Sequence, residues 1–161
     1  MSYHHRLGAV GALLDEYERA LNELIQVIAS LSDAALTCTL DPHTADVNCR
    51  SIQSILTHVV SCGYGYATSI HNRNGKTLVR PAAVAYDSIA AYQMALANMF
   101  AFTEGIFRDI QDNDLEQLDQ ARKFQSSWGQ YYDVEQLMEH AIVHILRHRR
   151  QIEKLTALLK V

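Results

Sequence analysis

The chain has 161 residues, a length that predicts one domain spanning residues 1–161 with a substantial hydrophobic core. Its formal net charge is −4 and its acidic and basic residues are interspersed, so we expect no nucleic-acid partner. No apolar stretch approaches the roughly 18 residues of a membrane span, so no membrane association is expected. The cysteines Cys38, Cys49 and Cys62 are odd in number and irregularly spaced, and the start of the chain lacks a secretory signal. We therefore expect a reduced, cytoplasmic protein.

The first two long helices are predicted in the N-terminal half. Apolar residues recur at spacings of three and four between about residues 7 and 31, opposite an acidic and polar face, which is typical of a half-buried helix. Residues 33–50 are rich in Thr, Asp, Asn and Cys and are expected to form a loop. Ser51 is a candidate N-cap for a second helix that runs to about Asn72.

The other two helices are predicted in the C-terminal half. The third covers about residues 87–112, and a polar segment follows at 113–132. The fourth helix is expected to begin at Asp133, where Asp133 and Gln136 have the spacing of a capping box.

Four long helices with connections of about 15–20 residues predict an all-α fold, a four-helix bundle. A short β-hairpin at residues 77–84 or 123–132 is possible in the connections, but we do not favour it. Gly63 and Gly65 fall inside the predicted second helix. We interpret them as positions where another segment approaches closely, because glycine lowers helix stability and nothing else here indicates a break.

Three histidines, His140, His144 and His148, stand four residues apart in the predicted last helix. Side chains at this spacing are neighbours, so two adjacent imidazoles can bind one metal ion. All three cannot, because the first and last would be about 12 Å apart along the axis. Spacing alone leaves open which pair binds. A simpler interpretation is that they are surface histidines near a helix C-terminus.

A third ligand has to come from another helix. The candidate is His58, which stands among apolar residues in the second helix. The alternative is a buried histidine that hydrogen-bonds to a backbone carbonyl. Cys62, one turn later on the same face, is a candidate fourth ligand, although most such cysteines are small buried apolar residues.

The pattern resembles the DinB/YfiT-like family of metal-binding four-helix bundles. That family has one histidine in its second helix and a His-x-x-x-His pair in its fourth. The pair is typically followed by a tail like Arg-Gly-Gln-Ile, and a small residue or glycine stands upstream of the helix. Here His58 takes the first position, and His144-Ile-Leu-Arg-His148 is followed by Arg-Arg-Gln-Ile. Gly129 stands upstream, while Arg150 replaces the frequent glycine.

This register selects His144 and His148 over His140 and implies a metal site made of His58, His144 and His148. Three imidazoles leave at least one coordination position open, which is typical of catalytic or substrate-binding sites. The expected cofactor is a divalent metal ion, zinc or nickel in a purified sample, and the sequence does not identify the native metal.

Relatives in this superfamily include bacillithiol S-transferases and mycothiol-dependent isomerases. The resemblance therefore implies a metal-dependent, thiol-using transferase or related detoxification enzyme, with a small-molecule substrate, a low-molecular-weight thiol and a homodimeric state. A non-catalytic metal-binding or stress-response protein and a helical interaction module stay open as alternatives. Arg147 or Arg149 is a candidate for a substrate carboxylate, and His140, Glu139 and Tyr131 are candidate bases by position alone.

Overall fold

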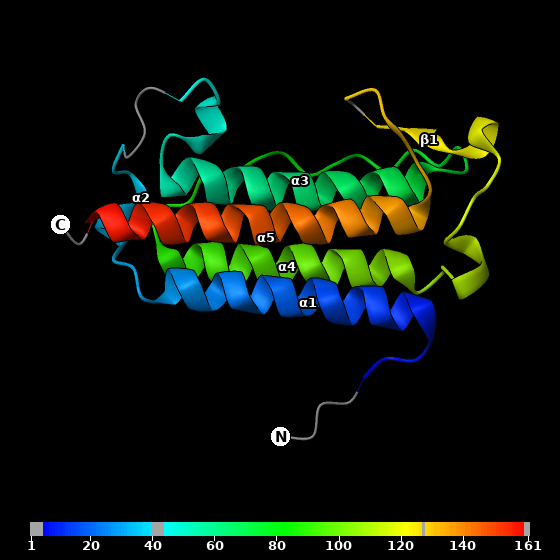
Figure 1. The fold of residues 1–161 in the computed structure, drawn as a ribbon, viewed down its shortest axis with the longest axis horizontal. Coiled ribbons are helices and arrows are strands. Elements are labelled where there is room, and N and C mark those ends of the chain that lie inside the picture. The colour runs from blue at the N-terminus through cyan, green and yellow to red at the C-terminus, as the bar shows by residue number, and fades with distance from the viewer. Residues whose placement is uncertain (1–4, 40–43, 127, 160–161) are drawn as a thin grey trace.

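The fold is a bundle of four long helices that lie side by side (Figure 1). The computed structural model describes residues 5–39, 44–126 and 128–159. The long helices are α1 (Gly8–Ala29), α3 (Ile52–Asn72), α4 (Ile89–Phe107) and α5 (Val134–Leu159). The predicted all-α bundle is confirmed. None of the helices in the described residues combines the length and the hydropathy of a membrane span.

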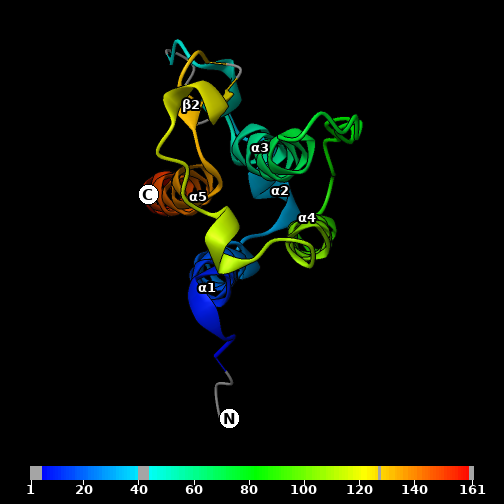
Figure 2. The same cartoon turned by 90° about the vertical axis from the view of Figure 1, so that its right-hand side faces the viewer.

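The end-on view in Figure 2 shows how the helices are paired. Both α1 and α3 pack against α4 and α5, so the order around the bundle is α1, α4, α3, α5. In Figure 1, α1 and α5 run in one direction, and α3 and α4 run in the other. The consecutive helices α3 and α4 are thus parallel, so the chain has to return along the bundle between them.

Residues 73–88, here called the return segment, make that connection. They run back along α3 as an extended chain without regular secondary structure (Figure 1). Side-chain hydrogen bonds fix the segment to successively earlier turns of α3: Asn72 with Leu78, Ser61 with Arg80, and Gln53 with Tyr86. The return segment therefore holds its side chains against one face of α3.

The core lies between the four helices, and their apolar stripes supply it. Its largest fully buried apolar side chains, each less than 2 % exposed, include Leu24, Ile28, Ile52, Ile55, Leu56, Tyr92, Leu96 and Met99. Gly63 lets α3 and α4 approach, because a Cβ there would lie 1.9 Å from Sδ of Met99. The interpretation of Gly63 as a close-approach position is confirmed.

Three of the four long helices are capped by a side chain at their own N-cap position. Ser51 and Ser54 form a capping box at the start of α3, which confirms the predicted N-cap. Asp133 and Gln136 exchange side-chain and backbone hydrogen bonds before α5, as their spacing predicts. The side chain of Ser88 caps α4, a signal that the sequence analysis did not use.

Two boundaries differ from the sequence prediction. The segment expected to be a loop at 33–50 contains a short helix, α2 (Asp33–Leu36), which forms because Leu36 is fully buried, and the 3-10 turn η1 (Val47–Cys49). Residues 40–43 of that segment lie outside the described residues. The third long helix ends at Phe107, five residues before the predicted end.

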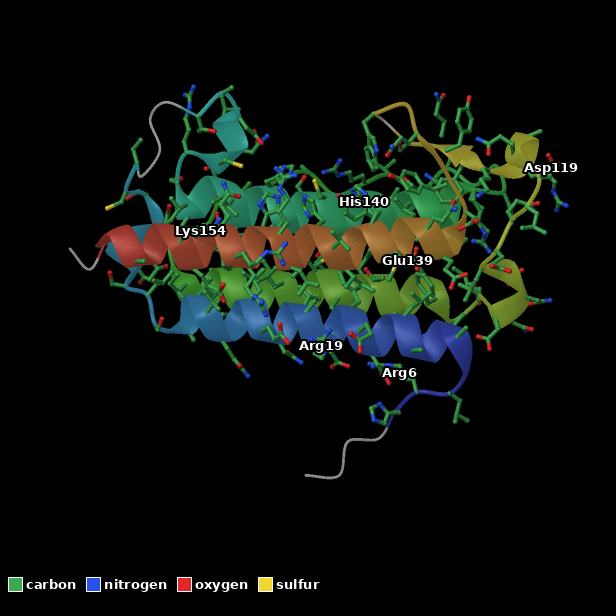
Figure 3. The ribbon with its side chains drawn as sticks, in the orientation of Figure 1. Arg6, Arg19, Asp119, Glu139, His140 and Lys154 are labelled. Carbon is green, nitrogen blue, oxygen red and sulfur yellow. The ribbon has the colours of Figure 1, made fainter. Side chains whose placement is uncertain are left out.

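Because α4 ends early, the residues that follow it contact the start of α1. Asp112, in the 3-10 turn η2 (Asp112–Asp114), accepts a hydrogen bond from the backbone N–H of Val10 and caps α1. Hydrogen bonds from the backbone N–H groups of Val10 and Ala9 lower the pKa of the Asp112 carboxyl. Arg6, labelled in Figure 3 near the start of α1, forms ion pairs with Asp15 of α1 and Glu104 of α4 and so joins these two helices.

The connection before α5 contains the 3-10 turn η3 (Gln120–Arg122) and a hairpin of two short strands. β1 (Phe124–Gln125) pairs antiparallel with β2 (Tyr131–Tyr132), with Phe124 opposite Tyr132. The hairpin turn includes Gly129 at a φ of 90°, a conformation that side chains disfavour. Of the two hairpins that we did not favour, the one at 123–132 is therefore present, whereas residues 77–84 form part of the return segment.

Candidate metal centre

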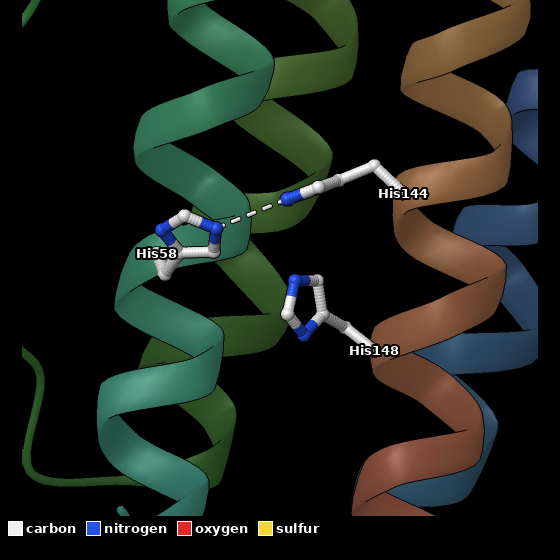
Figure 4. Close-up of side chains that lie close together, drawn as sticks. All are labelled: His58, His144 and His148. Atoms are coloured by element: carbon white, nitrogen blue, oxygen red, sulfur yellow. Dashed lines mark hydrogen bonds between the residues drawn. The ribbon is translucent and has the colours of Figure 1, made fainter. Parts of the chain in front are cut away.

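The packing of α3 on α5 brings His58, His144 and His148 together. One ring nitrogen of each histidine lies within 4.8 Å of the others, and the Nε2 atoms of His58 and His144 are 3.0 Å apart (Figure 4). The ring centroids of His144 and His148, one helical turn apart, are separated by 4.5 Å. The three residues selected by the sequence pattern thus form one cluster.

A hydrogen-bond partner orients the deepest of the three rings. Nδ1 of His148 lies 3.0 Å from Oε1 of Gln151, and the imidazole is only 4 % exposed. Since the amide oxygen only accepts, Nδ1 carries the proton and Nε2 keeps a free lone pair. Histidines that bind metals in proteins are commonly oriented in this way.

Burial keeps all three rings neutral. The pKa of His144 is lowered to about 3, mainly by burial and further by the nearby His148 and His58. Burial also lowers the pKa values of His58 and His148. Neutral imidazole is the form that coordinates a metal ion, so these rings need to lose no proton to bind one at neutral pH.

The donor set fits a divalent transition metal. Tetrahedral zinc with Zn–N distances near 2.1 Å separates its ligand nitrogens by about 3.4 Å. The His58 and His144 nitrogens are 3.0 Å apart, and all three lie within 4.8 Å of one another. Imidazole suits zinc, nickel, copper and iron. The three-histidine cluster could therefore hold a metal ion, with at least one coordination position left open.

Cys62 and His140 lie beside the cluster, outside the group of mutually close ligand atoms found in the described residues. Sγ of Cys62 is 3.6 Å from Nε2 of His58, and burial raises the pKa of this thiol. The His140 ring stacks on Trp128 with a centroid distance of 5.0 Å. Figure 3 places His140 on the side of α5 that faces α3.

A cavity of about 490 Å³ opens next to the cluster. His58 and His144 form part of its wall, and so does Cys62. Most of the remaining wall is apolar or aromatic, and comes from α3, the hairpin and α5: Tyr66, Phe124, Trp128 and Leu137. The volume is within the range of about 300–1,000 Å³ found for small-molecule sites.

The other sequence candidates do not line this cavity. Arg149 forms ion pairs with Glu23 of α1 and Glu153 of α5, and Arg147 borders a separate hollow. Glu139 and Tyr131 border another hollow on the far side of His140. Among the candidate bases, His140 alone has a place in the cavity wall.

Sequence reasoning missed four polar residues of the cavity wall: Thr68, Ser69, Arg80 and Ser126. Ser69 stands eleven residues after His58 in α3, about three turns along the same face, so a stripe of residues on that face could have indicated it. Arg80 belongs to the return segment, whose path along α3 has no local sequence signal.

Comparison with known proteins identifies a family. No curated protein matches the chain. The model of the DinB family matches residues 1–159, nearly the whole sequence. The chain belongs to the DinB family.

Proposed function

We propose that His58, His144 and His148 bind a divalent metal ion, and that the protein is a metal-dependent transferase that joins a low-molecular-weight thiol to a small electrophile. One observation carries the proposal: His58 and His144 belong both to the histidine cluster and to the wall of the cavity. An ion held by the cluster would therefore have its open position toward a space that accepts a small molecule.

When bound, a metal ion with three imidazole ligands supplies Lewis acidity and can hold a thiol as its thiolate. The residues of this chain prepare the site. Gln151 holds His148 with its Nε2 free, and burial keeps the imidazoles neutral. The side chains of Tyr66 and Leu137 line the cavity and reduce the access of water to the reacting groups.

No protein nucleophile is required. Cys62 is the one thiol in the cavity wall among the described residues, and burial raises its pKa, so it stays protonated at neutral pH. The nucleophile would then be the thiol substrate. In the transfer, a sulfur–carbon bond forms, the leaving group departs with the bonding electron pair of the electrophile, and the thiol proton passes to solvent.

The first test is metal content. Untagged protein purified without nickel resin is analysed for metals, because nickel can displace a weaker-binding native ion. We expect close to one equivalent of divalent metal in the natural sequence and none in His58→Ala. If the purified protein contains no metal and does not bind added zinc or nickel, the proposal is overturned and a helical interaction module is favoured.

The second test is turnover. The metal-loaded protein is mixed with 1-chloro-2,4-dinitrobenzene and a panel of small thiols that includes cysteine and glutathione, and thioether formation and chloride release are followed. We expect a rate above background that chelation abolishes and added metal restores. Stoichiometric metal without turnover across the panel would favour the non-catalytic metal-binding alternative.

The proposal includes a small-molecule electrophile as substrate and a homodimer, as the family resemblance implies. Sedimentation velocity on the metal-loaded protein tests the second point, with a mass of two chains expected.

A further inference from the structure

An arginine from outside the bundle reaches the cavity. Arg80 lies on the return segment, lines the cavity and donates a hydrogen bond to Oγ of Ser61 on α3. Its guanidinium lies over Gly65, where a Cβ would be 3.1 Å from Cζ and Nη1. The absence of a side chain at Gly65 thus leaves space for the guanidinium of Arg80. This explains why a glycine stands inside the predicted second helix.

Among the residues that the structure describes, none forms an ion pair with Arg80. Within the described residues, no carboxylate oxygen lies within 4.0 Å of the guanidinium nitrogens. A cation beside a mostly apolar cavity favours an anionic ligand.

Thr68 is a second polar residue of the cavity wall, and its hydroxyl has no hydrogen-bond partner among the residues that the structure describes. The residue is 7 % exposed. A threonine inside a helix commonly bonds to the carbonyl one turn earlier, so an unsatisfied hydroxyl here is unusual. Buried polar groups without a protein partner are typically satisfied by a ligand or by water.

The apolar part of the cavity is built from aromatic rings. Trp128 stacks on His140 at an interplanar angle of 24°, and Tyr66 packs edge-on against Trp128 with centroids 6.1 Å apart. Flat ring faces of this kind suit a planar apolar ligand.

The position of Arg80 limits the length of such a ligand. The guanidinium contacts α3 at Ser61 and Gly65, three and seven residues after His58. At about 1.5 Å per residue, these positions lie roughly 5–10 Å along the axis from the histidine cluster. One or two fused rings span this distance.

We propose that the cavity binds a small carboxylate carried on a flat apolar body. Arg80 holds the carboxylate, Tyr66 and Trp128 contact the rings, and the opposite end of the ligand lies at the histidine cluster. This inference rests on the proposed function only for the identity of the ligand as a substrate, because the binding site itself requires no metal.

The test is a pair of isosteric probes, 2-naphthoate and its neutral amide 2-naphthamide. Isothermal titration calorimetry measures both on the metal-free and on the zinc-loaded protein. We expect the carboxylate to bind the metal-free protein at least tenfold more tightly than the amide, since a charged hydrogen-bonded pair is lost in the amide. Equal affinities, or no binding of either probe, would overturn the proposal.

Two variants with matched controls assign the anion site. Arg80→Gln should remove the preference for the carboxylate, whereas Arg108→Gln, an exposed arginine at the end of α4, should keep it. Gly65→Ala should weaken carboxylate binding several-fold by displacing the guanidinium while the charge stays. Gly105→Ala has no heavy atom within 4 Å of its new Cβ and should change nothing. Circular dichroism checks that each variant folds.

The same experiment separates this inference from the proposed metal chemistry. A carboxylate preference that appears only with zinc and survives Arg80→Gln would mean direct binding to the metal, and would overturn the role of Arg80. A preference in the metal-free protein that Arg80→Gln abolishes supports the anion site even if the protein shows no transferase activity. Trp128→Leu should lower the affinity for both probes to a similar extent, because both probes carry the same rings.

Discussion

Nδ1 of His148 and Oε1 of Gln151 lie 3.0 Å apart, one turn from each other on α5. The same oxygen is 3.6 Å from Sγ of Cys49, which is buried at the end of η1. The His148 ring donates to the amide oxygen of Gln151, while the single proton of the Cys49 thiol also has Oδ2 of Asp46 as an acceptor, at 3.4 Å. As a result, Nε2 of His148 is the nitrogen directed toward His58 and His144 (Figure 4).

This contact predicts that Gln151 controls metal affinity without touching the metal. Gln151→Ala frees the His148 ring to rotate and to change tautomer, so we expect zinc affinity to fall by about 10- to 100-fold, as for other partners of metal-binding histidines. Gln151→Glu keeps an acceptor at the same place and should retain most of the affinity. Competition with a chromophoric chelator measures both, and unchanged affinity in Gln151→Ala would contradict the role.

The cluster predicts different outcomes for neighbouring residues. His144→Ala and His148→Ala should lose bound metal and keep their helicity, because each removes one of three ligands from the surface of a packed helix. His140→Ala and Cys62→Ser should keep the metal, because neither side chain belongs to the group of mutually close ligand atoms. Elemental analysis with circular dichroism checks all four variants.

The opposite result would be equally informative. If His140→Ala lost the metal and His148→Ala retained it, the ligand pair on α5 would be one turn nearer the hairpin. The resemblance of the Gln-Ile tail to the family motif would then have selected the wrong register.

The sequence predicts the helices and the histidine cluster well because both depend on local periodicity. The four-residue spacing of His144 and His148 determines that they share a face of α5. His58 follows from its place in an apolar stripe of α3, since two stripes that pack together bring their polar residues together. The family motif supplied the choice between His140 and His148, which spacing alone left open.

The cavity could not be predicted in this way. Arg80 reaches it because the return segment runs along α3, and that path depends on contacts between residues distant in sequence, such as Tyr86 with Gln53. Trp128 reaches it through a hairpin with strands of only two residues each, too short for an alternating pattern. Both parts of the wall are thus products of tertiary structure.

Burial of the histidines predicts how the metal-stripped protein responds to pH. In the unfolded chain these side chains have a pKa near 6.5, whereas in the folded protein the pKa of His144 is lowered to about 3 and those of His58 and His148 are also lowered. Above pH 6.5 both states are neutral at these rings, so pH has little effect. Below it, the unfolded chain takes up protons that the folded protein excludes, and stability falls.

For each proton that the unfolded chain binds and the folded protein does not, the free energy of unfolding falls by up to about 1.4 kcal/mol per unit decrease in pH. Urea unfolding between pH 7 and pH 5, a range above the ordinary pKa of the carboxyl groups, should show this loss in the presence of a chelator. His144→Gln should have a shallower dependence because it removes the group with the most strongly lowered pKa of the three. A flat profile in the natural sequence would mean that the rings are accessible to protons in the folded state.

The contact between α3 and α4 predicts a stability effect that is independent of the metal. In Gly63→Ala the new Cβ would lie 1.9 Å from Sδ of Met99, which is fully buried and lies 3.3 Å from the hydroxyl of Tyr17. Because Met99 has little room to move, we expect a loss of about 1–3 kcal/mol in the free energy of unfolding, typical of an overpacked core. Gly105→Ala on α4 meets no neighbour and should be neutral or stabilising by up to about 1 kcal/mol, since alanine favours a helix over glycine. Urea unfolding of both variants in the presence of a chelator measures the difference, and equal stabilities would show that the two helices separate at Gly63 without cost.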